Sequence, residues 1–275
     1  MSNISASLVK ELRDKTGAGM MDCKNALNEN NGDIESSIDW LRTKGLAKAA
    51  KKSGRVASEG LIAVSSSDDF SAIIEVNSET DFVARDSNFL SLAQSIGKNL
   101  LNDDSNIDII SESISTAISK LGENIKLRRH IKISKNNNAY GYCHNNKIAA
   151  LVELKNDDVN LAKDICMQIV ASNPLALDEA SLSQDILESE KEIYKNELAK
   201  LDKKEDIKRN ILEGKMKKFI NENTLLNQPF VKDPAISLSK VIKDNQIISY
   251  TRYEVGEGIE KKTEDFAQEV YNQIS

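Results

Sequence analysis

The stretch Gly60-Leu61-Ile62-Ala63-Val64 is followed by a polar segment at residues 65–69 and a second apolar run at residues 70–76. Two runs rich in β-branched residues around a short polar turn predict a β-hairpin. Residues 89–101 follow with their apolar side chains on one helical face, which predicts an amphipathic helix. This order of hairpin and helix indicates an α+β unit.

A similar pattern recurs about 80 residues further along the chain. Residues 140–143, a turn at Asn145-Asn146 and residues 148–154 predict a second hairpin. An acidic loop then leads into an amphipathic helix at residues 161–170. The repetition predicts an internal duplication of the α+β unit. Three further elements are expected, namely a helix at 109–121, a strand at 125–133 and a late strand at 247–255 that returns to the second copy.

The first 54 residues read as a compact module of three short helices. Ser5 can cap the first helix, and the glycines of Thr16-Gly17-Ala18-Gly19 end it. The third helix, which carries Ile34, Ile38 and Leu41, is expected to stop near Gly45. Residues 42–55 then hold six positive charges and no acid, which favours a basic helical linker. A solvated connector is preferred over a binding patch for this linker.

Residues 184–227 have a different character. Leu187, Tyr194 and Leu201 repeat every seven residues, and Lys and Glu fill the positions between them, as in a coiled coil. A charged break at residues 202–206 divides the segment in two. We therefore expect an antiparallel helical hairpin that projects from the core, with an ordinary surface pair of helices as the alternative.

Composition argues against several classes of protein. The 275 residues carry a net charge of −6, which gives nucleic acid no general electrostatic reason to bind. No apolar run is longer than five residues, so no segment is expected to span a membrane, and the N-terminus has no secretory pattern. Cys23, Cys143 and Cys166 are odd in number and widely spread, which favours a reducing cytoplasm over a disulfide framework.

The residues show no enzyme signature and no metal site. Cys143 and His144 are neighbours on an expected strand end, where adjacent side chains face opposite sides and cannot easily share a metal. No glycine-rich phosphate loop and no Gly-x-Ser-x-Gly element occurs, and Gly256-Glu257-Gly258 reads as a tight turn. We therefore expect a protein that is not an enzyme.

The most unusual stretch is the charged loop at residues 77–86. It lies after a strand and before a helix, and it places Phe82 and Val83 among charged neighbours. Such an apolar pair either tucks into its own core or anchors a partner, and the residues alone favour the core. Asp86 or Ser87 is expected to cap the next helix.

Thr80-Asp81-Phe82-Val83 resembles the Thr-Asp-Phe-Val signature of the bacterial elongation factor Ts family. The opening of the chain is similar to that family's N-terminal block, and further matches follow in order over nearly the whole chain. The matching blocks are residues 6–13, 16–24, 80–86, 214–219, 228–231 and 253–261.

The resemblance implies an α+β architecture with five parts. The three-helix module would be ubiquitin-associated-like, the core would hold two related α+β subdomains, an antiparallel coiled-coil hairpin would protrude, and a short C-terminal helix would complete the chain. The expected bounds are 1–54 for the module, 55–135 for the first subdomain, 136–183 with 228–263 for the second, 184–227 for the hairpin and 264–275 for the C-terminal helical module.

The resemblance also implies a function. Members bind elongation factor Tu in its GDP form and promote GDP release during translation in the cytoplasm, without a covalent step. Mg²⁺ and GDP or GTP would belong to the partner, so no cofactor is expected in this chain. Neither nucleic acid nor membrane is an expected direct partner, whereas a homodimer or a 2:2 complex through the hairpin stays open.

The site residues follow from the same resemblance. Asp81 would disturb the partner's Mg²⁺ and phosphate-binding elements, and Phe82 would enter an apolar pocket between partner helices. Thr80 and Val83 would hold the loop. The N-terminal module around Leu12, Met20 and Met21 would touch the partner's nucleotide domain, and the region near His144 would face another domain.

Two departures and one alternative accompany this interpretation. The family often has Lys where Arg85 stands, and the break at residues 202–205 lacks Gly and Pro, so the hairpin tip can differ in shape. The alternative function is an adaptor that holds polypeptide through its three-helix unit, because Met20 and Met21 offer an adaptable surface. That alternative predicts that residues 1–54 alone bind a peptide partner.

Overall fold

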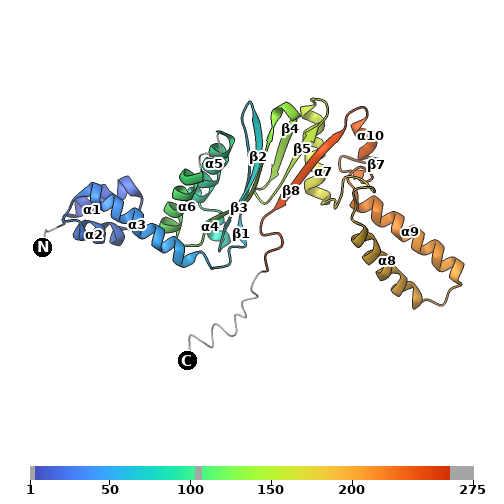
Figure 1. Cartoon of the computed structure of the whole chain (residues 1–275), viewed down its shortest axis with the longest axis horizontal. Coiled ribbons are helices and arrows are strands. Elements are labelled where there is room, and N and C mark those ends of the chain that lie inside the picture. The colour runs from blue at the N-terminus through green and yellow to red at the C-terminus, as the bar shows by residue number, and fades with distance from the viewer. Residues whose placement is uncertain (1–3, 103–106, 261–275) are drawn as a thin grey trace.

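The computed structural model describes residues 4–102 and 107–260. The molecule is elongated, with a helical module at one end, a core of sheets and helices in the middle and a long helical hairpin at the other end (Figure 1). Helix and sheet are both abundant, as the α+β prediction requires. In the part of the chain that the structure describes, no helix is long and apolar enough to cross a membrane.

The N-terminal module consists of α1 (Ala6–Thr16), α2 (Met20–Glu29) and α3 (Ile34–Lys52). The Ser5 hydroxyl accepts a hydrogen bond from the Leu8 amide at 3.2 Å, as expected for an N-cap. Gly17 ends α1 with a φ of +63°, a conformation that glycine adopts without strain. The module's likeness to ubiquitin-associated modules stays a prediction.

The expected end of the third helix near Gly45 is wrong, because α3 continues to Lys52. Gly45 lies inside the helix where α3 packs on α6 (Ile107–Leu121), and a Cβ atom there would stand only 2.7 Å from the Ser119 hydroxyl oxygen. The glycine therefore permits close packing of two helices and does not terminate one. The basic linker is thus the second half of a single helix.

Several charges of the basic segment at residues 42–55 are used within the chain. Arg42 pairs with Glu112 of α6 at 3.2 Å, and Lys48 pairs with Asp22 of α2 at 2.8 Å. The Lys52 ammonium donates a hydrogen bond to the Gly122 carbonyl. These contacts agree with a structural connector better than with a free basic patch.

The core contains two three-stranded antiparallel sheets with the same topology. In each, a hairpin is followed by helices and then by a third strand beside the second one, so the predicted hairpins and the late strand are confirmed (Figure 1). The first sheet holds β1 (Glu59–Ser66), β2 (Phe70–Ser78) and β3 (Lys126–Ser134); the second holds β4 (Ala139–His144), β5 (Ile148–Leu154) and β8 (Ile247–Glu254).

Alternation along the strands divides their side chains between two cores. Ile74 and Val76 face α5 (Ser87–Asn102) and α6, whereas Ile73 lies between the two sheets with Ala149 and Leu151. The outer face of the second sheet packs on α7 (Val159–Ser172). The core is therefore layered as helices, sheet, sheet and helix.

The sheets approach each other closely at Gly141. A Cβ atom at this position would stand 2.7 Å from Cγ1 of Val64, so the absence of a side chain permits the contact. The backbone amide of Ile62 also donates a hydrogen bond to the Asn146 carbonyl at 2.8 Å. The two units are thereby joined by apolar packing and by direct hydrogen bonding.

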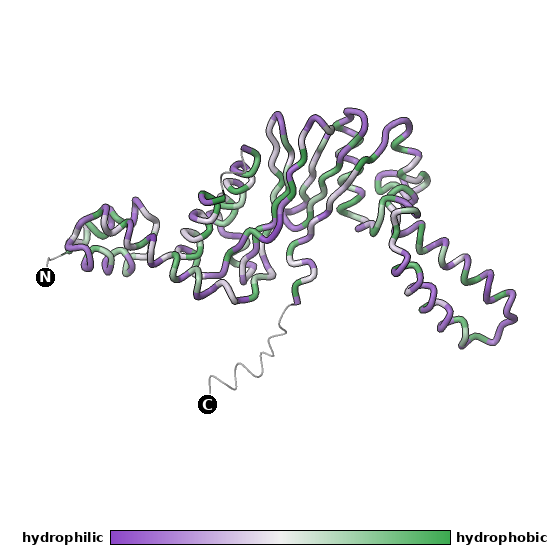
Figure 2. Tube along the Cα trace, in the orientation of Figure 1, coloured by the Kyte–Doolittle hydropathy of each residue, from purple (hydrophilic) through white to green (hydrophobic). Residues whose placement is uncertain are grey.

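The predicted antiparallel hairpin consists of α8 (Gln184–Ala199) and α9 (Glu205–Asn223), which project together from the core (Figure 1). Figure 2 shows both helices as mostly hydrophilic with apolar residues interspersed. Lys215 pairs with Glu197 at 2.5 Å across the hairpin and lies over the Tyr194 ring. Coiled-coil packing in the strict sense, and a role in dimerisation, stay predictions.

Short elements complete the chain around the second sheet. They are the 3₁₀ turn η2 (Lys135–Asn137), β6 (Pro229–Phe230), β7 (Asp233–Ser237) and α10 (Leu238–Ile242). The expected C-terminal helical module at 264–275 lies outside the described residues. The expected domain bounds likewise stay predictions.

Candidate functional site

The Thr80–Val83 stretch forms a single helical turn, α4 (Asp81–Ala84), between β2 and α5. Thr80 is its N-cap, since the Thr80 hydroxyl accepts a hydrogen bond from the Val83 amide at 3.4 Å. The Asp86 carboxylate then accepts from the Asn88 amide at 2.7 Å and caps α5, as the sequence predicted. Two successive helix caps, Thr80 for α4 and Asp86 for α5, therefore fix the backbone of this loop.

Phe82 and Val83 have opposite environments, although they are neighbours in the sequence. Val83 is half-buried and packs on the core between the first sheet and its helices. The Phe82 side chain is 83% exposed. The core interpretation that the residues alone favoured therefore holds for Val83 and is wrong for Phe82. A helical turn separates consecutive side chains by about 100°, so one can face inward while the next faces water.

Asp81 forms an ion pair with Arg85 one turn later, with 2.8 Å between Oδ2 and Nη2. Both side chains are exposed, and Arg85 is the more exposed of the two. Solvent-exposed pairs of this kind contribute only about 0.2–1 kcal/mol. The Asp81 carboxylate is therefore held in place weakly and can change partners.

Glu123 holds the start of the turn from outside. Its Oε1 accepts a hydrogen bond from the Thr80 hydroxyl at 2.5 Å, and its Oε2 accepts from the backbone amides of Glu79 and Thr80, each at 3.0 Å. Glu123 was not singled out in the sequence. The only signal for it was an acidic residue in the short Gly122-Glu123-Asn124 connection between a helix and a strand.

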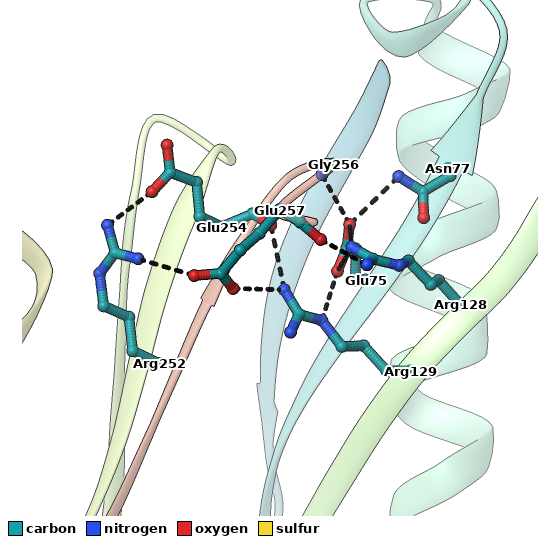
Figure 3. A network of polar contacts seen from close by, with 8 residues as sticks. All are labelled: Glu75, Asn77, Arg128, Arg129, Arg252, Glu254, Gly256 and Glu257. Atoms are coloured by element: carbon teal, nitrogen blue, oxygen red, sulfur yellow. Dashed lines mark hydrogen bonds and ion pairs between the residues drawn. The ribbon is translucent and has the colours of Figure 1, made fainter. Parts of the chain in front are cut away.

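A buried carboxylate, Glu75, organises the neighbouring end of the two sheets (Figure 3). It accepts hydrogen bonds from Arg129 Nε at 2.5 Å, from the Gly256 amide at 2.8 Å and from Arg128 Nη1 at 3.0 Å. Arg128 and Arg129 are adjacent on β3, and both reach Glu75 because the register with β2 skips Arg128. The first sheet is thus connected to the turn that follows β8.

The network continues through the turn to the second sheet. Arg129 donates to Glu257 at 3.0 Å, and Arg252 donates to Glu254 at 2.7 Å (Figure 3). Burial raises the pKa of Glu75, but hydrogen bonds from Gly256, Arg129, Arg128 and Asn77 outweigh it and hold the pKa below its ordinary value. Glu75 is therefore a charged, buried connector between the two sheets.

His144 lies at the same end of the core as α4. It is exposed at the end of β4, where its Nδ1 is 3.2 Å from the Tyr142 hydroxyl. The following turn reaches the start of β1, since Lys147 donates to the Gly60 carbonyl at 3.0 Å. Because Gly60 pairs with Asn77 at the end of β2, the structure brings this turn close to the strand that leads into Thr80.

The N-terminal candidates are placed apart from that end. Met20 and Met21 are exposed at the start of α2, at 49% and 66%, and α2 belongs to the N-terminal module. Leu12 is fully buried in the module. Leu12 therefore cannot present its side chain to a partner, and its contribution is to hold the helices that carry the exposed methionines.

A metal site is not formed by the cysteine and histidine residues singled out in the sequence. The Cys143 thiol points inward and donates to the Ile62 carbonyl at 3.3 Å, and burial raises its pKa. His144 faces solvent on the next position. Within residues 4–102 and 107–260, no group of three or more His, Cys, Asp or Glu side chains could hold a metal ion.

The chain is similar in sequence to known proteins over nearly its whole length. The family model described as Elongation factor TS matches residues 79–257. The chain is 44% identical to elongation factor Ts of Thioalkalivibrio sulfidiphilus over 287 residues, which covers 98% of both chains. It is 46% identical to that of Ruthia magnifica subsp. Calyptogena magnifica, covering 98% of this chain and 97% of the relative. With elongation factor Ts of a Nitratiruptor species it shares 47% identity, over 98% of this chain and 99% of the relative. The chain therefore belongs to the elongation factor Ts family.

Proposed function

We propose that this chain is a guanine-nucleotide exchange factor that binds elongation factor Tu with GDP and promotes GDP release. Members of the family generally act in this way on elongation factor Tu. The observation that carries the proposal is the Phe82 side chain, which is 83% exposed on a backbone turn held by Thr80 and Glu123. An aromatic ring kept in water on an ordered turn is well suited to enter a partner's pocket.

The order of the turn favours binding. Association costs free energy when loops and side chains must be ordered, about 0.5–1.5 kcal/mol for each immobilised flexible side chain. Phe82 has only two side-chain torsions, and its backbone is already fixed by the Thr80 cap. Large aromatic anchors in such positions commonly contribute 2 kcal/mol or more to an interface, as an order of magnitude. The ring would thus act as a wedge between helices of elongation factor Tu.

Asp81 supplies the electrostatic part of the proposed mechanism. Its carboxylate would approach the partner's Mg²⁺ and phosphate-binding elements and compete for their contacts. The weak exposed pair with Arg85 leaves this carboxylate available at small cost. The reaction needs no covalent chemistry, so the chain is proposed as an exchange factor and not as an enzyme, with Mg²⁺ and nucleotide held by the partner.

Two further surfaces would share the partner. Met20 and Met21 would contact the nucleotide domain of elongation factor Tu, and the turn at His144 would face another domain. Both are exposed. The exposed methionines would also serve an adaptor that holds polypeptide, but that alternative assigns no role to Phe82. As a translation factor, the protein would act in the cytoplasm.

The test is the release of a fluorescent GDP analogue from elongation factor Tu. The full chain is expected to accelerate release strongly, and Phe82→Ala is expected to lose at least about tenfold of that acceleration, the equivalent of 1.4 kcal/mol of interaction. Since Phe82 is exposed, its removal leaves the core intact, and thermal unfolding of Phe82→Ala should match that of the unaltered chain.

Val159→Ala is the matched control, because Val159 is another exposed apolar residue, located at the start of α7. It should release GDP as fast as the unaltered chain. Equal release by Phe82→Ala and the unaltered chain would remove the proposed wedge, and no acceleration by the unaltered chain would remove the proposed function itself.

A further inference from the structure

We propose that Glu123 is a positioning residue for nucleotide exchange, which fixes the α4 turn so that Phe82 and Asp81 reach the partner together. The inference rests on the proposed function. Glu123 lies outside the Thr-Asp-Phe-Val signature, in the connection between α6 and β3. It would affect exchange indirectly, through the α4 turn that it holds.

The contacts of Glu123 are concentrated on the base of the turn. One carboxylate oxygen accepts from the Thr80 hydroxyl at 2.5 Å, and the other accepts from the amides of Glu79 and Thr80, both at 3.0 Å. Hydrogen bonds to a carboxylate are roughly twice as strong as neutral ones. The two amides precede α4 and would otherwise need water as a partner. Glu123 therefore orients the residue that caps α4.

The connection is reciprocal. Glu79 returns a hydrogen bond, since its Oε1 accepts from the Asn124 amide at 2.6 Å. The same Glu79 oxygen lies 3.5 Å from the Arg55 guanidinium. The end of β2 and the 122–124 segment are thus joined by hydrogen bonds from each to the other. Because there are several such bonds, the turn cannot rotate freely about any one of them.

The 122–124 segment also holds the end of the N-terminal module's long helix. The Asn124 side chain, which is buried, donates to the Arg55 carbonyl at 2.7 Å, and Lys52 donates to the Gly122 carbonyl. One short segment therefore contacts both the turn that carries Phe82 and the end of α3, and α3 packs on the helix that carries Met20 and Met21. Two of the proposed partner-binding surfaces are fixed to the same piece of backbone.

Such an arrangement affects exchange more than it affects the fold. A group that must enter a pocket loses effect when its support is loose by about 1 Å. Glu123 is half-buried at the edge of the core and does not belong to either apolar core. Its removal should therefore leave the sheets packed while the turn samples orientations that do not fit the partner.

Two variants separate its charge from its hydrogen bonds. Glu123→Ala removes every contact to the turn. Glu123→Gln keeps the length, and its amide can accept from the two backbone amides while it donates to the Thr80 oxygen. If Glu123 acts by positioning, the Gln variant should recover most of the exchange activity that the Ala variant loses.

The experiment measures the maximal rate of GDP release from elongation factor Tu for six full-length proteins. They are the unaltered chain, Glu123→Ala, Glu123→Gln, Phe82→Ala, the double variant with Glu123→Ala and Phe82→Ala, and the control Glu112→Ala. We expect Glu123→Ala to lower the maximal rate about tenfold. In the Phe82→Ala background the same change should have almost no further effect, because Glu123 acts through the turn whose wedge is already missing. Glu112→Ala, which removes a carboxylate of α6 that does not touch the turn, should release GDP normally.

The outcomes distinguish this inference from the function on which it rests. If Glu123→Ala slows release equally in both backgrounds, or if Glu123→Gln is as slow as Glu123→Ala, the positioning role is overturned. Normal release by Glu123→Ala together with slow release by Phe82→Ala also overturns it and leaves the exchange function standing. Failure of the unaltered chain to accelerate release would overturn both.

Discussion

Among single residues, Glu75 contributes most clearly to holding the two sheets together at the end that carries the α4 turn. It is completely buried, and it receives hydrogen bonds from β3 on one side and from the turn after β8 on the other. A buried carboxylate is tolerated only when it is paired and hydrogen-bonded. Its network therefore fixes the second sheet relative to the strand that leads into Thr80.

The lowered pKa of Glu75 predicts that the stability of the protein depends on pH in a specific way. Because its pKa is lowered in the folded protein, it contributes stability above the ordinary carboxyl pKa, about 4.3, and loses that contribution as the pH falls through the folded value. Glu75→Gln should be less stable by about 3 kcal/mol or more at pH 7 and should lose less on acidification. Thermal unfolding between pH 7 and pH 3 measures both effects.

The control for this prediction is Glu192→Gln on α8. The pKa of Glu192 is also lowered, by its hydrogen bond to Lys195, but this pair is exposed. Its replacement should leave the midpoint nearly unchanged at every pH. A pH profile of Glu75→Gln that runs parallel to that of the unaltered chain would contradict the role of Glu75.

The residues of the turn show what the sequence could and could not predict. The signature at Thr80–Val83 and the cap at Asp86 were recognisable, because both depend on neighbours in the chain. The different exposure of Phe82 and Val83 could not be predicted, because it depends on the direction in which a one-turn helix presents its side chains. Glu123 and Glu75 were missed because their partners lie more than 40 residues away in the sequence.

At the scale of elements, the turn after β8 decides how closely the late strand approaches the first sheet. Gly256 has a φ of +73°, and a Cβ atom there would stand 2.3 Å from the Ser58 carbonyl oxygen. Gly258 has nearly the same φ of +72° but open space around it. The two glycines share a backbone conformation and differ in their surroundings.

This pair allows backbone strain to be separated from close packing. Gly258→Ala should destabilise the protein by about 1 kcal/mol, the usual cost of a left-handed conformation for a side chain. Gly256→Ala should cost about 1–3 kcal/mol more, because the backbone of Ser58 cannot move aside easily. Urea unfolding of both variants gives the difference, and equal destabilisation would show that the approach to Ser58 is unimportant.

Elements with a strong local pattern were predicted well. The two hairpins, the helices that follow them and the antiparallel helical hairpin agree with the structure. The end of α3 was predicted wrongly, because Gly45 was interpreted as a stop signal although it permits close contact with α6. Local sequence cannot distinguish a glycine that ends a helix from one that admits a neighbouring helix, since that neighbour is about 70 residues away.

At the level of the whole molecule, the elongated shape distributes the candidate partner surfaces along the length of the chain. The module carries Met20 and Met21, the core carries α4 and the turn at His144, and the hairpin projects beyond them (Figure 1). An exchange factor of this kind would bind several parts of elongation factor Tu at once. The energy of remote contacts could then support the displacement of nucleotide at the Asp81-Phe82 turn.

If the chain promotes GDP release, it must bind elongation factor Tu more tightly when GDP is weakly held or absent. Coupling of two ligands is reciprocal, so GDP must weaken binding of this chain by the factor with which the chain weakens binding of GDP. The most direct test is the dissociation constant of the full chain for nucleotide-free elongation factor Tu and for its Mg²⁺-GDP form. We predict about 100-fold or tighter preference for the nucleotide-free form, near the upper end of common coupling energies. Equal affinity for the two forms would contradict the proposed exchange function.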